Sequence, residues 1–202
     1  ALFYYLKCSE ILDERVKSVN PINNSVIYLE RYNKYCYHSV NNIGLIHLIN
    51  FEDYQKAFIY IIQSAKGKLP FGQNNLGLLN EFYNNDSHKA KYFYKKSAKR
   101  NFSLADYNLG HLKEKDGKID ESIEYFTKAL EDSALTFRKH QPYDKQLEIS
   151  KMFIICITNL KLAEYYFKQD LFNESKEYFK NSILKLESFE NLTHSFRFTF
   201  NF

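Results

Sequence analysis

Tryptophan is absent from this sequence, and cysteine, glycine and proline are scarce, which excludes several classes of protein. The 202 residues include three cysteines, six glycines and three prolines. Cys8, Cys36 and Cys156 are odd in number and far apart, and no C-x-x-C pair occurs, so a disulfide framework is excluded. We expect free thiols in a reducing compartment, hence an intracellular, cytoplasmic location, with association with the endoplasmic reticulum as the alternative.

Long apolar runs and a strong excess of one charge are also missing. No run reaches the roughly 18 residues that a membrane-spanning helix requires, so we expect no membrane span. The net charge is only +4, which by itself demands neither a nucleic acid nor an acidic membrane as partner. The 18 Phe and 17 Tyr can fill a sizeable core, so the composition is that of a folded protein.

Catalytic and metal-binding motifs are absent as well. None of the patterns G-x-x-x-x-G-K, G-x-G-x-x-G or H-E-x-x-H occurs. Cys36 and His38 offer two ligands, where zinc takes three or four. We therefore expect no enzyme activity, no cofactor, no metal and no small-molecule substrate.

An internal repeat with a step of 33 residues is what the sequence does contain. Gly44, Gly77 and Gly110 recur at this step inside NNIG, NNLG and YNLG, and Asp53 and Asp86 keep the same step. The further matches are Ala57 with Ala90, Ile61 with Tyr94, and the SAK segments at 64–66 and 97–99. A step of this size predicts stacked helical hairpins, none of which can bury its apolar face alone.

Each unit is predicted to form two helices with caps at their ends. In the third unit we expect Ser103, with Asp106 three residues later, to cap the first helix. Gly117 suits the left-handed residue that ends this helix, and Asp120 is expected to cap the second. By the same reasoning Asn173 should cap the second helix of the last unit.

Small residues should let the two helices of a unit approach closely. In the third unit Gly110 would face Ser122 and Ala129, with Phe126 filling the space beside them. Offsets of 12, 16 and 19 residues lead from Gly110 to these three positions. The same offsets from Ala163 predict a last unit with Ser175, Phe179 and Ser182 in the corresponding places.

About twenty extra residues separate these last two units. They predict a loop at Pro142 and a long helix from about Lys145 to Phe167. The apolar segment MFIICI, 152–157, within this helix is expected to be core or partner surface.

The predicted fold is all-α: a right-handed α-α superhelix, or solenoid, of about five antiparallel helix pairs in one domain. Residues 2–18 and 22–35 have helical periodicity that fits a degenerate first pair, with a turn at Asn20-Pro21. The expected domain covers residues 1–188, followed by a Phe-rich tail over 189–202. Its approximate units are 1–35, 36–69, 70–102, 103–144 and 145–188.

Two kinds of segment carry a family resemblance. DSHKAKYFYKKSAKRNFSLADYNLG, 86–110, resembles a Sel1-like repeat in its Asp, its Lys-Ala, its aromatic residue, its small-small pair and its Leu-Gly, and residues 53–77 do the same. LGHLKEKDGKIDESIEYFTKAL, 109–130, and LAEYYFKQDLFNESKEYFKNSI, 162–183, are similar to the related tetratricopeptide repeat (TPR). The resemblance covers about residues 36–188 and implies a scaffold or adaptor for protein partners.

The resemblance also implies where a partner would bind, because the first helix of each pair lines the concave face of such a stack. The residues expected there are Asn41, Asn42, Leu45, Asn74, Asn75, Leu78, Tyr107, Asn108, His111 and Lys161. Repeats of this family that bind chaperone tails carry a basic clamp on these helices. Here Lys161 alone is basic at the corresponding positions, so that partner is not expected.

The repeated asparagines predict a groove for an extended peptide, because an amide can match both backbone groups of a peptide. The first function hypothesis is thus a non-catalytic scaffold that binds a peptide or protein partner on this face. In the alternative interpretation these amides bond the neighbouring repeat or water, and the codon bias of an AT-rich genome supplied them.

The basic segment HKAKYFYKKSAKR, 88–100, has interleaved aromatics, which superficially suits RNA. Lys91, Lys95 and Lys99 would form one stripe on a helix, while Tyr94 and Ala98 belong to its buried face. We interpret the stripe as a solvated outer face and do not expect nucleic-acid binding, since no extended basic footprint occurs.

The last eight residues, SFRFTFNF, alternate polar residues with Phe. This period of two predicts an extended tail, either folded over the last pair or paired with other protein. ALFYYL at the other end is apolar too, whereas terminal repeats normally present polar faces. The second function hypothesis is therefore a structural or regulatory segment of a larger chain or complex that contacts partners through apolar ends.

Overall fold

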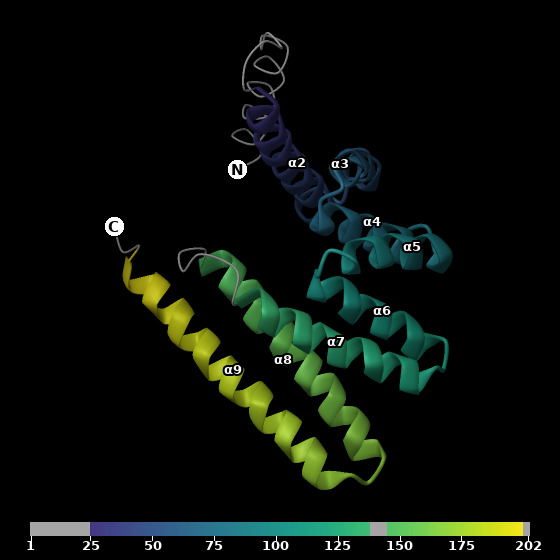
Figure 1. Cartoon of the computed structure of the whole chain (residues 1–202), viewed down its shortest axis with the longest axis vertical. Helices are drawn as coiled ribbons and strands as arrows, with labels where there is room; N and C mark the ends of the chain where they lie inside the picture. The colour runs from purple at the N-terminus through teal and green to yellow at the C-terminus, as the bar shows by residue number, and fades with distance from the viewer. Residues whose placement is uncertain (1–24, 138–144, 200–202) are drawn as a thin grey trace. The chain divides into compact units, whose positions relative to one another are not determined.

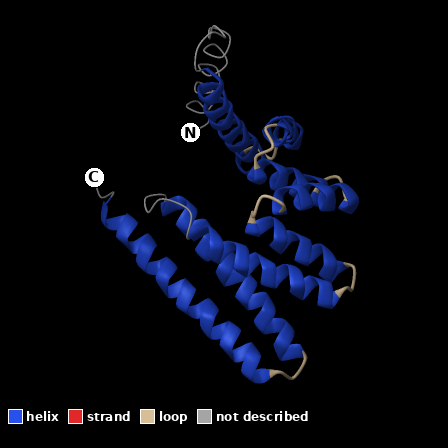
Figure 2. Ribbon diagram, in the orientation of Figure 1, coloured by secondary structure: helices blue, strands red, loops and turns tan. Residues whose placement is uncertain are grey.

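The computed structural model describes the backbone of residues 25–137 and 145–199, and the side chains of residues 37–133 and 151–188. These parts of the chain contain eight helices and no strand (Figures 1 and 2). The helices are α2 (Ser25–Asn50), α3 (Tyr54–Lys66), α4 (Pro70–Phe82), α5 (Ser87–Ala98), α6 (Ser103–Lys115), α7 (Ile119–Phe137), α8 (Lys145–Lys168) and α9 (Phe172–Thr199). The all-α fold is confirmed.

Consecutive helices pack in pairs: α2 with α3, α4 with α5, α6 with α7 and α8 with α9. The chain divides into two compact units, Ala1–Arg100 and Asn101–Phe202. The first unit therefore holds α2–α5 and the second holds α6–α9. In the first unit α3 also packs on α4, and in the second α7 packs on α8, so each unit is a stack of helical hairpins.

The repeat glycines lie where two helices touch, as expected. A Cβ atom added at Gly44 would lie 2.7 Å from the Ile61 side chain, and one at Gly77 would lie 2.5 Å from Tyr94. One at Gly110 would lie 2.6 Å from the Phe126 ring. Real Cβ contacts are not that short, so only glycine allows these helices to approach so closely. The 33-residue step therefore marks the positions at which the two helices of a pair come into closest contact.

The repeated aspartates cap the second helices of the first unit. The Asp53 carboxylate accepts a hydrogen bond from the Lys56 backbone N–H at 3.1 Å, at the start of α3. Asp86 does the same at the start of α5, where the Lys89 N–H donates at 2.9 Å. A carboxylate here also suits the positive end of the helix dipole.

Three expected caps are wrong. Ser103 is the first residue of α6, whose N-cap is Phe102 without a side-chain hydrogen bond. Asp120 and Asn173 each lie in the first turn, because α7 begins at Ile119 and α9 at Phe172. Asp106 makes no capping box, since its buried carboxylate accepts from Lys128 Nζ of α7 at 2.7 Å instead. Gly117 does end α6 with a φ of +72°.

The last pair confirms the predicted long helix. α8 spans Lys145–Lys168, and Met152, Ile154 and Cys156 of its MFIICI segment are buried while Phe153 is exposed. The Ser175 hydroxyl donates to the Ala163 carbonyl at 2.8 Å, where α9 crosses α8. The expected loop at Pro142 lies outside the described residues.

Phe179 differs from its counterpart Phe126. Phe126 is buried, whereas Phe179 is 45% exposed. Ala163 stands where the third unit has Gly110. The correspondence between the two units therefore holds for Ser175 and Ser182, which are buried like Ser122 and Ala129, and not for the ring.

The expected extended tail is wrong for residues 195–199, because α9 continues to Thr199. A helix satisfies its backbone hydrogen bonds within the segment, whereas a lone strand would leave them unpaired. That cost outweighs the preference of an alternating pattern for a strand. Residues 200–202 lie outside the described part of the chain.

The first expected unit also differs. Residues 25–35 belong to α2, which continues to Asn50, so the boundary expected between residues 35 and 36 falls inside one helix. Residues 1–24, where the other helix of that pair is expected, lie outside the described residues. The single domain over residues 1–188 stays a prediction. No helix in the described ranges is both long enough and apolar enough to span a membrane.

Candidate partner-binding site

Asparagines of the first unit form a hydrogen-bonded chain between α2 and α4. The Asn75 Nδ2 group donates to Asn41 Oδ1 at 2.9 Å, across a sequence separation of 34 residues. The Asn74 Nδ2 group donates in turn to Asn75 Oδ1 at 3.5 Å. Asn41 and Asn74 are 4% and 0% exposed. These amides therefore tie one hairpin to the next, which is the alternative interpretation given to them above.

The half-buried expected residues of this unit are Asn42, Leu45, Asn75 and Leu78. They leave a mixed polar and apolar surface along α2 and α4. Asn108, in α6 of the second unit, is buried, at 8% exposed. A continuous row of exposed amides is therefore not present among the described residues.

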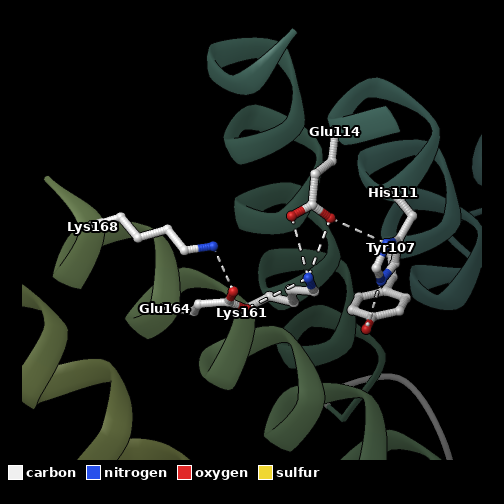
Figure 3. Close-up of polar contacts among 6 residues, drawn as sticks. All are labelled: Tyr107, His111, Glu114, Lys161, Glu164 and Lys168. Carbon is white, nitrogen blue, oxygen red and sulfur yellow. Dashed lines mark hydrogen bonds and ion pairs between the residues drawn. The ribbon is translucent and has the colours of Figure 1, made fainter. Parts of the chain in front are cut away.

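Side chains of α6 and α8 in the second unit form a connected row, which we call the α6–α8 polar row. Its members are Tyr107, His111, Glu114, Lys161, Glu164 and Lys168 (Figure 3). The Tyr107 hydroxyl lies 3.1 Å from His111 Nε2, and His111 Nδ1 lies 3.2 Å from Glu114 Oε2. Because a carboxylate only accepts, Nδ1 donates its proton to Glu114, and in a neutral ring Nε2 would then accept from the Tyr107 hydroxyl.

Lys161 connects the two helices of this row. Its ammonium lies 3.2 Å from Glu114 Oε1 in α6 and 3.6 Å from Glu164 Oε2 in α8. Lys168 closes the row with a 2.7 Å contact to Glu164 Oε1. Lys161 is therefore already held by two carboxylates, and a partner meets it as part of a network.

The environment shifts the pKa of three members of the row, and the hydrogen bond to Glu164 raises that of Lys168. Burial raises the pKa of the Tyr107 hydroxyl, and the charge of Glu114 adds to the rise. The hydrogen bond from Lys168 and the charge of Lys161 lower the pKa of Glu164. Around neutral pH the row thus presents a protonated phenol and an ionised carboxylate.

The repeat glycine helps to position this row. Gly110 admits the Phe126 ring, whose centroid lies 5.4 Å from that of Tyr107 and 5.7 Å from that of His111. Tyr107 and His111 meet edge to face at 4.9 Å. The three rings restrict one another's rotamers, so Tyr107 and His111 are presented in one arrangement.

Three of the expected residues, Tyr107, His111 and Lys161, are thus brought together. Glu114, Glu164 and Lys168 were missed, although spacings of three and four residues from His111, Lys161 and Glu164 signal such pairs on a helix. No local signal reveals the Glu114–Lys161 contact, which joins residues 47 positions apart.

The basic segment 88–100 matches its prediction as an outer face at two of the three stripe positions, since Lys91 is half-buried. Tyr94 and Ala98 are buried, and Lys95 and Lys99 are exposed. Lys96 lies over the Tyr92 ring at 4.3 Å.

Among the described residues, no three His, Cys, Asp or Glu side chains are grouped so that they could hold a metal ion.

No protein-family model and no curated protein matches the sequence. Among solved structures, the chain is similar to "Crystal structure of MamA protein", with a TM-score of 0.51 and 15% identity, over 92% of either chain. "MamA RS-1 ArsTM double mutant" gives a TM-score of 0.50 and 15% identity, over 91% of this chain and 95% of that one. MamA is a TPR-like helical repeat protein. Identity this low informs on the fold alone, and the fold is that of a TPR-like helical repeat.

Proposed function

We propose that this chain is a non-catalytic scaffold that binds an extended segment of a protein partner along the α6–α8 polar row. The observation that carries the proposal is the connection between Tyr107, His111 and Glu114 of α6 and Lys161 of α8. The first helices of their pairs, α6 and α8, thereby present hydrogen-bond donors and acceptors in one fixed arrangement. Fixed side chains lose little conformational entropy when a peptide docks.

The charges of the row favour one class of peptide. Two carboxylates face two ammonium groups, and Lys161 is neutralised by Glu114 and Glu164. A strongly acidic tail would have to displace these carboxylates. We therefore propose a segment of mixed or neutral charge whose backbone groups bond Tyr107, Glu114 and Lys168.

The half-buried residues of the first unit, Asn42, Leu45, Asn75 and Leu78, are proposed to contribute a second strip of contacts. The buried free thiol of Cys156 is compatible with a reducing compartment, and we propose an intracellular location.

A photo-crosslinking experiment tests the proposal. A photoreactive phenylalanine analogue is placed at Tyr107. Tyr92, which is exposed on α5, is the matched control, and Phe179 on α9 is a third position. Partners captured in cells are then identified by mass spectrometry. We expect one partner to be enriched at position 107 over position 92, and to be lost in the Glu114→Gln, Lys161→Met double variant. Equal capture at positions 107 and 92 would reject the binding face.

The second candidate function is a segment of an assembly that makes its contacts through its ends. The exposed Phe179, Ile183 and Leu186 on α9 favour it. Capture of a protein other than this chain at position 179, without capture at position 107, would support this function over the first.

A further inference from the structure

An apolar stripe runs along the exposed side of α9. Phe172, Phe179, Ile183 and Leu186 are 56%, 45%, 52% and 47% exposed. Their spacings of seven, four and three residues place them on one face of the helix. We call these four side chains the α9 stripe. Four large apolar side chains in a row are more than scattered exposure, and they indicate a contact surface.

The position that corresponds to Phe179 is buried in α3 and in α7. Ile61 and Phe126, which correspond to Phe179, are 0% and 4% exposed. α3 is covered by α4, and α7 by α8. The α9 stripe therefore includes the side on which α3 and α7 receive a neighbour.

Two positions of the stripe carry larger side chains than some of their counterparts in the helices that receive a neighbour. Ala65 of α3 and Leu130 of α7 correspond to Ile183, and Ser133 of α7 corresponds to Leu186; Ala65 and Ser133 are buried and Leu130 is half-buried. Small residues suit the close approach of a further hairpin. Phe, Ile and Leu instead suit interdigitation with a second row of large side chains.

Charges beside the stripe indicate that the second row of large side chains belongs to another copy of α9. Lys176 and Glu187 are both exposed and lie eleven residues apart, which is about three helical turns, so they flank the same edge of the stripe. An antiparallel copy of α9 would place Phe179 on Ile183 of the other copy. It would also bring each Lys176 within a turn of the other copy's Glu187, and this occurs twice because the pair is two-fold symmetric.

We propose that α9 is a self-association surface on which a second copy of this chain packs antiparallel, through the α9 stripe and the two Lys176–Glu187 pairs. This surface is separate from the α6–α8 polar row and does not depend on the proposed peptide binding. One helix on one helix is a small interface, so the dimer is reversible and of micromolar affinity or weaker.

Sedimentation velocity across a wide range of protein concentrations tests the proposal. The wild-type chain should shift from monomer to dimer as concentration rises. Ile183→Asp should weaken association about a hundredfold, because it places a charge in the apolar contact. Since Ile183 is exposed in the single chain, the melting temperature should not fall.

Charge reversal tests the antiparallel register. Lys176→Glu alone and Glu187→Lys alone each create two like-charge contacts and should weaken self-association about tenfold. Mixing these two variants should restore dimerisation as a heterodimer, since both contacts then join opposite charges. Lys185→Glu is the matched control, because Lys185 is exposed on α9 away from the stripe, and it should leave association unchanged.

Three results would overturn the proposal. If the wild-type chain stays monomeric at all concentrations, the stripe binds a different protein or helix and not a second copy. A dimer unaffected by Ile183→Asp would place the interface elsewhere. Failure of the mixed charge variants to associate better than either alone would exclude the antiparallel pair.

Discussion

At the scale of single residues, Asp106 shows how packing can override a local role. Three residues after Ser103 it suits a capping box, yet its side chain is fully buried against α7, where Lys128 donates to it. Burial raises its pKa to about 6 from the usual 3.8, with Lys128 acting in the opposite direction and the nearby Asp132 adding to the rise. The carboxyl thus favours its protonated form more than an exposed aspartate does.

The raised pKa predicts a pH dependence of stability. As pH rises from about 4 to about 6, the unfolded chain releases this proton before the folded chain does, so stability falls across that window. Compared with Asp106→Asn, the free energy of unfolding of the wild type should decrease by about 1–3 kcal/mol. Urea titrations of both proteins at a series of pH values measure this difference. A constant difference across the window would contradict the prediction.

At the scale of helices, the close contact between α6 and α7 depends on Gly110. Its missing side chain leaves room for Phe126, which in turn supports Tyr107 and His111. This one contact therefore connects the repeat pattern to the proposed binding face.

Gly110→Leu should force these helices apart and cost about 1–3 kcal/mol of unfolding free energy, because the core has no room for the added side chain. Thermal unfolding followed by circular dichroism measures the effect.

A double-variant cycle controls for a general loss of helicity. Phe126→Ala removes the opposing ring and should cost about 3–5 kcal/mol by leaving a cavity. Adding Gly110→Ala to that variant should then be harmless or stabilising, whereas in the wild type it should destabilise. Equal effects in both backgrounds would mean that the two residues are not in contact.

Helix pairing and the tight contacts could be predicted from the sequence. Gly44, Gly77 and Gly110 recur in register with the side chains that they admit. These contacts lie within one helix pair, so they do not depend on how the pairs are arranged. Three of the caps could not be predicted, because Ser103, Asp120 and Asn173 suit the first turn as well as the position before it.

The structure of the alternating Phe-rich tail was also predicted incorrectly. The phenylalanines of 195–202 suggested a strand, but a strand needs a partner, whereas α9 can continue without one. The backbone of residues 195–199 is therefore helical.

At the scale of the whole molecule, the second unit has its own core. Leu109, Leu112, Phe126, Leu162 and Ala163 are buried, and α6–α7, α7–α8 and α8–α9 pack consecutively. Its helices can therefore cover one another's apolar faces without the first unit.

Residues 101–202 expressed alone should accordingly be helical and unfold cooperatively in urea. Residues 138–202, which keep only α8 and α9, are the matched control and should unfold without a clear transition, since a single hairpin cannot bury its apolar face. Circular dichroism measures both. An unfolded 101–202 fragment would show that its core requires the first unit.

The sequence by itself determined the helix pairs, the close contacts at its repeated glycines and the length of α8, because these follow from periodicity over a few turns. Only the tertiary structure decided that Asn41 and Asn75 bond to each other, that Glu114 meets Lys161, and that Phe179 points outward. Such features depend on residues far apart in sequence, and they follow from how whole helices pack.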